Sequence, residues 1–150
     1  MQNVIIYSDG SCLWNPGRGG WAALIKENGN ERVLSGTEAN STNNRMELTA
    51  ALKALEALSG HSQVDFYTDS EYLRRGITEW LPGWRVRGWK RKGGKLANVE
   101  LWQALEKAIE RHQIRWHWVK GHSTNKDNQR VDQLAREAML GMQPKNRKNA

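Results

Sequence analysis

Over the first forty residues, hydrophobic and polar positions follow patterns that are typical of β-strands. Residues 4–7 are wholly apolar, which predicts a short buried strand covered on both faces. Residues 21–25 and 31–38 predict two more strands, and the Asn-Gly-Asn run at 28–30 indicates a hairpin between them. We therefore expect three antiparallel strands joined by short turns.

The pattern then changes to the period of an amphipathic helix. Leucines and alanines line one face of residues 46–58, after polar N-cap candidates at 41–44. The remaining predicted elements are a strand at 64–68, a short helix at 70–77, a helix at 98–111 capped by Asn98, a strand at 114–119 and a helix at 126–140. A helix between two strands predicts a right-handed parallel crossover. These elements predict an α/β fold with a mixed five-stranded sheet, three antiparallel strands and then two parallel ones, flanked by helices.

Composition limits the classes of protein that this chain can be. Its 150 residues suit one domain with a real core, which we place at 1–140, followed by a basic, frayed tail at 141–150. The net charge of +7 favours a polyanionic partner such as nucleic acid, although solubility alone can explain a milder excess. The lone Cys12 excludes an intrachain disulfide and favours the reducing cytoplasm. We find no signal peptide and no membrane-spanning segment, and we expect a monomer.

Four acidic residues stand at the mouths of predicted buried elements. Asp9 and Asp69 each follow a core strand, and Glu47 lies on the rim of the helix between those strands. Parallel strands open at one edge of a sheet, which is where ligands bind in α/β proteins. Asp132 falls in the first turns of the last helix, where the helix dipole favours an ionised group. Taken singly, Asp9 could be a turn aspartate, Glu47 a surface glutamate and Asp132 an ordinary aspartate at a helix start. Taken together, the four acids predict a functional site.

Carboxylates clustered in this way repel one another unless cations neutralise them. An all-oxygen donor set suits Mg²⁺ or Mn²⁺, and the sequence has no cysteine–histidine cluster of the kind that binds zinc. Two such ions about 4 Å apart would stabilise the attacking and leaving oxygens of an in-line phosphoryl displacement. His122, in the polar loop before the last helix, could shuttle protons, although a loop histidine is more often a bystander.

Six segments, in their order and spacing, resemble the bacterial ribonuclease HI family over roughly residues 3–140. They are Tyr7-Ser8-Asp9-Gly10-Ser11-Cys12, Asn15-Pro16-Gly17, Thr42-Asn43-Asn44-Arg45-Met46-Glu47-Leu48, Tyr67-Thr68-Asp69-Ser70, Trp118-Val119-Lys120-Gly121-His122 and Asp132-Gln133-Leu134-Ala135. The resemblance implies a ribonuclease H-like fold and two Mg²⁺ ions, which Mn²⁺ could replace. Their ligands would be Asp9, Glu47, Asp69 and Asp132, and His122 would assist proton transfer or product release. The implied reaction is endonucleolytic hydrolysis of the RNA strand of an RNA–DNA hybrid, which leaves 3′-hydroxyl and 5′-phosphate ends.

The resemblance also implies a set of substrate contacts. Asparagine side chains and nearby backbone amides would meet the 2′-hydroxyl that distinguishes RNA from DNA. The residues expected at the substrate are Gly10, Cys12, Asn15, Thr42, Asn43, Asn44, Glu71, Trp80, Asn98 and Trp102. Within this set, Thr42 resembles part of a phosphate pocket, and the two tryptophans resemble residues that flank the DNA strand. The asparagines could instead cap turns and helices, or do both.

Residues 80–95 are basic and contain no acidic residue. Their cations are Arg85, Arg87, Lys90, Arg91, Lys92 and Lys95. The stretch resembles the basic protrusion with which the family grips the DNA strand, because phosphate neutralisation gives affinity without reading sequence. The plainer alternative is a solvated, charged hairpin. We assign Trp84, Trp89, Trp116 and Trp118 to packing.

Some positions depart from the pattern of the best-known bacterial members. Trp14 stands where glycine is usual, and Glu71 where glutamine is common. Three functions stay open: a hybrid-specific ribonuclease, a metal-dependent DNA strand-transferase or resolvase of the same fold, and a hybrid-binding module that does not cut. The basic protrusion and the asparagines favour the ribonuclease, and the four acids argue against the binding module.

Overall fold

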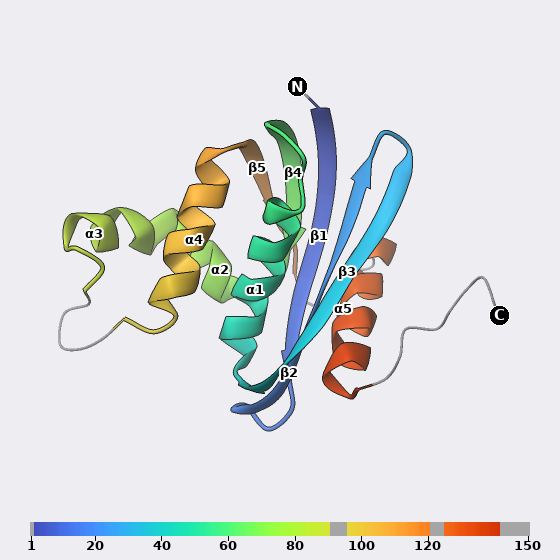
Figure 1. Cartoon of the computed structure of the whole chain (residues 1–150), viewed down its shortest axis with the longest axis horizontal. Helices are drawn as coiled ribbons and strands as arrows, with labels where there is room; N and C mark the ends of the chain where they lie inside the picture. The colour runs from blue at the N-terminus through green and yellow to red at the C-terminus, as the bar shows by residue number, and fades with distance from the viewer. Residues whose placement is uncertain (1, 91–95, 121–124, 142–150) are drawn as a thin grey trace.

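The computed structural model describes residues 2–90, 96–120 and 125–141, and it confirms the predicted five-stranded mixed sheet (Figure 1). The strand order is β3-β2-β1-β4-β5, with β1–β2 and β2–β3 antiparallel and β1–β4 and β4–β5 parallel. The strands are β1 (Gln2–Cys12), β2 (Gly17–Glu27), β3 (Asn30–Ser41), β4 (Ser62–Thr68) and β5 (Gln113–Trp118). The helices are α1 (Asn43–Glu56), α2 (Glu71–Arg75), the π-helical turn η1 (Gly76–Trp80), α3 (Leu81–Val86), α4 (Val99–Glu110) and α5 (Lys126–Met139).

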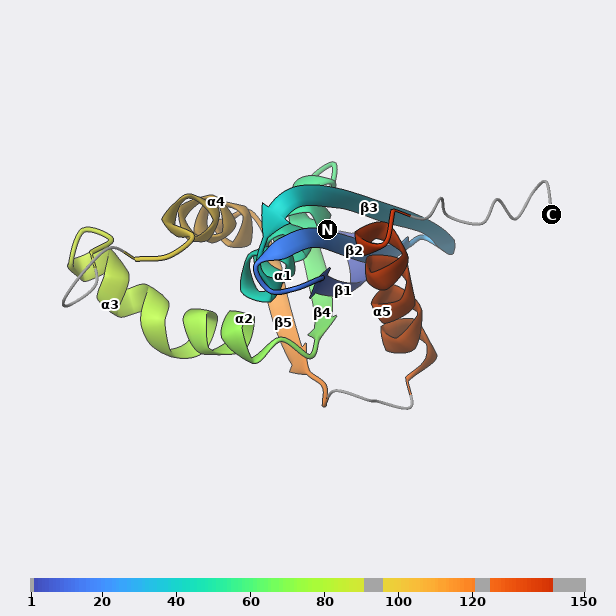
Figure 2. The same cartoon turned by 90° about the horizontal axis from the view of Figure 1, so that it is seen from below.

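Helices cover both faces of the sheet, with α1 and α4 on one side and α5 on the other (Figures 1 and 2). Alternation along β1 explains this arrangement, since successive side chains of a strand point to opposite faces. Val4 and Ile6 enter the main core with the apolar face of α1. Tyr7 points the other way and packs with Leu24 of β2 and Val131 of α5. Among the described residues, no helix is long and apolar enough to cross a membrane.

The first strand is longer than its apolar run predicts. Residues 8–12, expected as a loop, continue the antiparallel ladder, in which Asp9 pairs with Ala22. The parallel pairing of β1 with β4 stops at Tyr7, at the end of the apolar run. The antiparallel pairing of β1 with β2 continues to Cys12, because backbone hydrogen bonds to β2 do not require apolar side chains. Asp9 therefore lies inside β1 and not after its end, which corrects the expectation from sequence.

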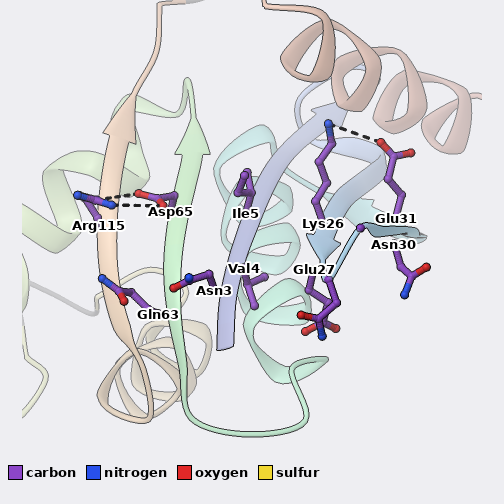
Figure 3. Close-up of a pocket in the computed structure, with 12 residues that line it drawn as sticks. Asn3, Val4, Ile5, Lys26, Glu27, Asn30, Glu31, Gln63, Asp65 and Arg115 are labelled. Carbon is purple, nitrogen blue, oxygen red and sulfur yellow. Dashed lines mark hydrogen bonds and ion pairs between the residues drawn. The ribbon is translucent and has the colours of Figure 1, made fainter. Parts of the chain in front are cut away.

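The expected cover on both faces of β1 is also wrong near its start. The side chain of Ile5 is 38% exposed. It lies in an open groove of about 670 Å³ near the amino-terminal ends of β1 and β4, where Lys26 and Arg115 also lie (Figure 3). Both cations are paired there, Lys26 with Asp127 and Arg115 with Asp65.

The first part of the basic stretch is helical, which its composition does not predict. After η1 the chain forms α3, which lies at the end of the molecule farthest from β3 (Figure 1). Pro82 falls in the first turn of α3, where its missing N–H breaks no helical hydrogen bond. Trp84 is buried in the main core, as expected, and Arg85, Arg87 and Lys90 are exposed. The other three cations, Arg91, Lys92 and Lys95, lie outside the described residues.

Candidate active site

Three of the predicted acids come together at one edge of the sheet. Asp9 projects from β1, Glu47 from the second turn of α1, and Asp69 directly follows β4. One oxygen from each can be chosen so that all three oxygens lie within 4.8 Å of one another. Gly10 permits this approach, because a Cβ there would stand 2.5 Å from the backbone nitrogen of Glu47. Glycine thus lets the start of α1 lie directly against β1 and brings Glu47 to Asp9.

The fourth acid, Asp132, reaches the cluster from α5. Asp132 is not one of the three acids within 4.8 Å of one another, but its carboxyl group lies close enough to raise the pKa of Asp9, and Arg136 donates to its Oδ2 from 3.0 Å. The side chain is 50% exposed, so Asp132 lies at the solvent side of the cluster. Gly20 of β2 lets α5 come this close, because a Cβ there would stand 2.2 Å from the backbone nitrogen of Met139.

The electrostatics of the cluster are those of acids held together out of water. Burial raises the pKa of Asp9 to about 8, helped by the hydrogen bond to Asp132 and by the negative charges of Asp69 and Asp132. Burial, and then the charges of Asp9 and Asp69, raise the pKa of Glu47 well above its usual range. Each carboxylate therefore destabilises the ionised form of its neighbours when no cation is present.

One buried atom indicates what the cluster is suited to hold. Oε1 of Glu47 has no hydrogen-bond partner in the part of the chain that the structure describes. A buried carboxylate oxygen is costly unless a donor or a cation satisfies it. The donor atoms of the cluster are all carboxylate oxygens, which suit a hard divalent cation such as Mg²⁺ or Mn²⁺. The residues therefore fit a divalent metal site.

The loop that carries His122 lies outside the described residues, so the role of this histidine stays a prediction. The chain resumes at Asn125, which caps α5 by accepting a hydrogen bond from the backbone N–H of Asn128 at 2.9 Å. Its Nδ2 also donates to the hydroxyl of Tyr7 at 3.4 Å. This end of the loop is thus attached to β1 two residues before Asp9.

The turn after β1 and the start of α1 form one continuous polar edge beside the acids. Oδ1 of Asn15 accepts a hydrogen bond from the backbone N–H of Asn43 at 2.9 Å. Thr42 caps α1, since its hydroxyl accepts from the N–H of Arg45 at 3.1 Å. Asn43 and Asn44 are exposed. The structural alternative is therefore confirmed for Asn15 and Thr42, while the exposed amides of Asn43 and Asn44 are accessible to a ligand.

Two further predicted substrate contacts, Gly10 and Cys12, lie on β1 at the same edge. Cys12, near Gly10 on β1, is partly buried and its thiol donates to the carbonyl of Ser41 at 3.3 Å. The thiol thereby joins the end of β1 to the residue before Thr42.

The predicted direct contact of Trp102 with a DNA strand is wrong. Its side chain has 0% exposure, and its Nε1 donates to the hydroxyl of Tyr72 at 3.1 Å. The ring fits because Gly76 leaves space for it, since a Cβ at that position would stand 2.0 Å from the indole. A ring without exposed surface cannot contact a nucleotide.

The other predicted contacts in this region keep accessible surface. Trp80 is partly buried with the Arg75 guanidinium 5.5 Å from its ring centre, and Glu71 is exposed at the start of α2. Asn98 stands at the N-cap of α4, but its side chain makes no capping hydrogen bond, contrary to expectation. Its amide instead donates to the hydroxyl of Tyr72 at 3.2 Å.

Arg45, which no sequence pattern singled out, holds α1, β3 and α4 together. Arg45 of α1 donates from Nε to Glu38 of β3 at 2.7 Å and from Nη1 to Glu100 of α4 at 3.0 Å. Its partners lie 7 and 55 residues away, so no local spacing could reveal the network. The only signal was that Arg45 stands inside the motif containing Glu47.

Comparison with known proteins agrees with this geometry. The RNase H family model matches residues 1–140. Curated relatives include a ribonuclease H of Xanthomonas campestris pv. campestris (strain 8004), 57% identical over 141 residues that cover 93% of this chain and 94% of the relative. Another is a ribonuclease H of Cupriavidus pinatubonensis (strain JMP 134 / LMG 1197), 52% identical over 143 residues, with 95% and 99% covered.

Solved structures give the same result. The crystal structure of LC9-RNase H1, described as a type 1 RNase H with the type 2 active-site motif, superposes with a TM-score of 0.85 at 35% identity. The match covers 95% of this chain and 74% of that one. LC11-RNase H1, solved in complex with an RNA/DNA hybrid, is 23% identical and superposes with a TM-score of 0.68. The match covers 92% of this chain and 97% of that one, and at this identity it supports the fold alone. With a family model that spans nearly the whole chain and relatives more than half identical, this chain belongs to the ribonuclease H family.

Proposed function

We propose that this chain is an endonuclease that hydrolyses the RNA strand of RNA–DNA hybrids, leaving 5′-phosphate and 3′-hydroxyl ends, with little sequence specificity. The observation that carries the proposal is the meeting of Asp9, Glu47 and Asp69 within 4.8 Å, with Asp132 close enough to raise the pKa of Asp9. A cluster of this kind can hold divalent cations, and membership of the ribonuclease H family supplies the substrate class.

The four acids are the proposed ligands of two Mg²⁺ ions, which Mn²⁺ could replace. Bound ions supply charge stabilisation to the attacking and leaving oxygens of a phosphoryl displacement. Asp9 and Glu47 must lose their protons to act as ligands, which the raised pKa of each opposes until a cation arrives. Asp132, half exposed and already held by Arg136, is the acid most accessible from solvent. His122 is proposed to assist proton transfer or product release.

Selectivity for RNA is proposed to come from the polar edge beside the acids. Asn43 and Asn44 are exposed there, and Asn15 is fixed to the start of α1, so amide groups are held ready for 2′-hydroxyls. Gly10 and Cys12 would contribute backbone amides, Thr42 and Asn98 would lie near phosphates, and Glu71 and Trp80 would border the strands.

The basic stretch at 80–95 is proposed to bind the DNA strand through its phosphates. Arg85, Arg87 and Lys90 are exposed on and after α3, as such a role requires, although Arg85 already pairs with Glu106. A surface that neutralises phosphates makes affinity fall with added salt. We further propose one catalytic domain at 1–140 with a basic tail at 141–150, acting as a monomer in the cytoplasm.

A panel of substrates tests this function. The protein is incubated with Mg²⁺ and an RNA–DNA hybrid, a DNA duplex, an RNA duplex and a four-way DNA junction. We expect cleavage of only the RNA strand of the hybrid, and loss of cleavage in Asp9→Asn. Asp65→Asn is the matched control, because Asp65 also lies on the sheet but pairs with Arg115 outside the cluster. Cleavage of the junction would support the strand-transferase or resolvase alternative, and binding without cleavage the binding module.

A further inference from the structure

The turn that joins β1 to β2 presents an exposed tryptophan next to the polar edge of the site. The side chain of Trp14 is 82% exposed, and its backbone has a φ of +64°. L-residues other than glycine, asparagine and aspartate seldom adopt this left-handed conformation, because Cβ then crowds the backbone. Both the exposed ring and the left-handed backbone of Trp14 are unfavourable in the free protein.

The turn fixes the backbone from which this ring projects. The backbone N–H of Leu13 donates to the carbonyl of Arg18 at 2.8 Å and closes the turn. Asn15, the next residue after Trp14, is bonded to the N–H of Asn43 at the start of α1. Because the residues on both sides of Trp14 are fixed, a ligand that meets this turn meets a tryptophan with a preorganised backbone, and little backbone entropy is lost on contact.

We propose that Trp14 packs its indole against the minor-groove surface of the bound hybrid and so contributes to substrate affinity. This inference rests on the proposed function. The 2′-hydroxyls of an A-form-like duplex line a wide and shallow minor groove. Amides of Asn15, Asn43 and Asn44 that meet those hydroxyls must face this groove, and Trp14 projects from the same edge. A flat ring fits a shallow groove and buries sugar carbons as well as its own exposed surface.

The position of Trp14 along the chain predicts where on the hybrid it makes contact. Trp14 stands five positions after Asp9, and an extended chain advances about 3.3 Å per residue, so their Cα atoms lie at most about 17 Å apart. This upper bound corresponds to about five base-pair steps of about 3.4 Å each. Trp14 is therefore a substrate-positioning residue at a distance from the scissile phosphate, and its loss should raise KM and leave kcat unchanged.

Two substitutions separate this contact from a structural role. Trp14→Asn removes the ring and supplies a residue that tolerates the left-handed backbone. We expect its thermal midpoint to equal or exceed that of the parent, while KM for a long hybrid rises about tenfold, which corresponds to covering about 55 Å² of apolar surface, roughly a quarter of an exposed tryptophan. Trp14→Phe keeps a ring at the same position and should hold KM within about threefold of the parent value. A purely structural tryptophan would instead change KM and thermal midpoint together.

Hybrids shortened in two-base-pair steps from either end give the second measurement. The ratio of KM between Trp14→Asn and the parent should fall to one when the duplex no longer reaches the turn, about five base pairs from the cleaved bond. Binding of the same hybrids without turnover, followed by fluorescence anisotropy in metal-free buffer, should show the same ratio.

The possible results keep this inference separate from the proposed function. Hybrid cleavage with an unchanged KM in Trp14→Asn would overturn the inference and leave the ribonuclease activity standing. Absence of cleavage would refute the proposed function, and the anisotropy ratio would then decide whether Trp14 contacts nucleic acid. A change of mass in size-exclusion chromatography for Trp14→Asn, without a change in hybrid affinity, would assign the ring to a contact between copies of the chain and overturn the inference.

Discussion

Replacing Asp9 by asparagine should make the metal-free protein more stable while abolishing its activity. The pKa of Asp9 is raised from 3.8 to about 8 in the folded state, first by burial and then by the neighbouring acids. A raised pKa in the folded state gives stability that is fully present below 3.8 and is lost progressively as pH rises towards 8. The asparagine side chain in Asp9→Asn would stay neutral at every pH and can still donate a hydrogen bond to Asp132, so the variant escapes this loss.

The expected size of the effect follows from the pH interval. Between 3.8 and pH 7 there are 3.2 pH units, and at about 1.4 kcal/mol per unit the wild-type chain loses about 4 kcal/mol at pH 7. For a chain of this length, each kcal/mol moves the thermal midpoint by roughly 2–4 °C, so Asp9→Asn should melt about 8–16 °C higher at pH 7. Near pH 4 the two proteins should melt together.

Urea and thermal unfolding at several pH values, in chelator and in Mg²⁺, measure this difference. Mg²⁺ binding to the folded wild-type chain should stabilise it and narrow the gap, because ligand binding to the native state adds to its stability. Asp65→Asn is the control of opposite sign. Hydrogen bonds from Arg115 and His117 hold the pKa of Asp65 below its usual range, so its loss should destabilise the protein at pH 7, by about 1 kcal/mol or less. A stability gap for Asp9→Asn that is absent at pH 7, or equal at pH 4 and pH 8, would refute the reasoning.

Three further predictions concern the surroundings of the site. Gly20→Ala places a Cβ 2.2 Å from the backbone nitrogen of Met139, so α5 must move away by about 1 Å to reach an ordinary contact distance. This movement should lower kcat about a hundredfold in steady-state cleavage assays. Burial lowers the pKa of His112, so as the pH falls the unfolded state takes up a proton before the folded state does. The free energy of unfolding should therefore decrease as pH drops below about 6.5, and urea titrations should show that this decrease is absent in His112→Asn. Tyr72→Phe leaves the buried Nε1 of Trp102 without its acceptor and should lower the free energy of unfolding by about 1–3 kcal/mol in urea, with kcat kept if the network is only structural.

Local patterns in the sequence were enough to predict the five strands and which of them run parallel, but they were not enough to show where β1 ends or that α3 forms. The apolar run of residues 4–7 correctly placed a core strand. It could not show that residues 8–12 also pair, because these residues are themselves mostly polar or small, although their partners at 21–23 belong to the predicted second strand. Likewise, the charges of residues 80–95 concealed α3, which forms because Trp84 and Leu81 bury one side of it in the core.

The candidate site likewise contains residues that could be predicted from the sequence and residues that could not. Asp9, Glu47 and Asp69 could be grouped from sequence because each lies near the end or the start of an element that the topology brings to one edge. The burial of Trp102 could not be predicted, since it depends on space left by Gly76, a residue 26 positions earlier in a different helix. Arg45 was missed for the same reason, because its ion pairs join three elements that are distant in the chain.

The acids destabilise the fold that holds them, so their separation must be set by contacts that do not yield. Gly10 and Gly20 provide such contacts, because each places backbone against backbone: β1 against the start of α1, and β2 against α5. The first contact sets the distance from Asp9 to Glu47, and the second sets the reach of Asp132. Side-chain packing can relax by rotamer changes, whereas two backbones in contact can separate only if a whole helix moves. A cluster whose repulsion favours separation is thus kept in place by backbone contacts that leave no space for a side chain, and substitutions at these two glycines should alter catalysis more than substitutions of equal volume elsewhere in the core.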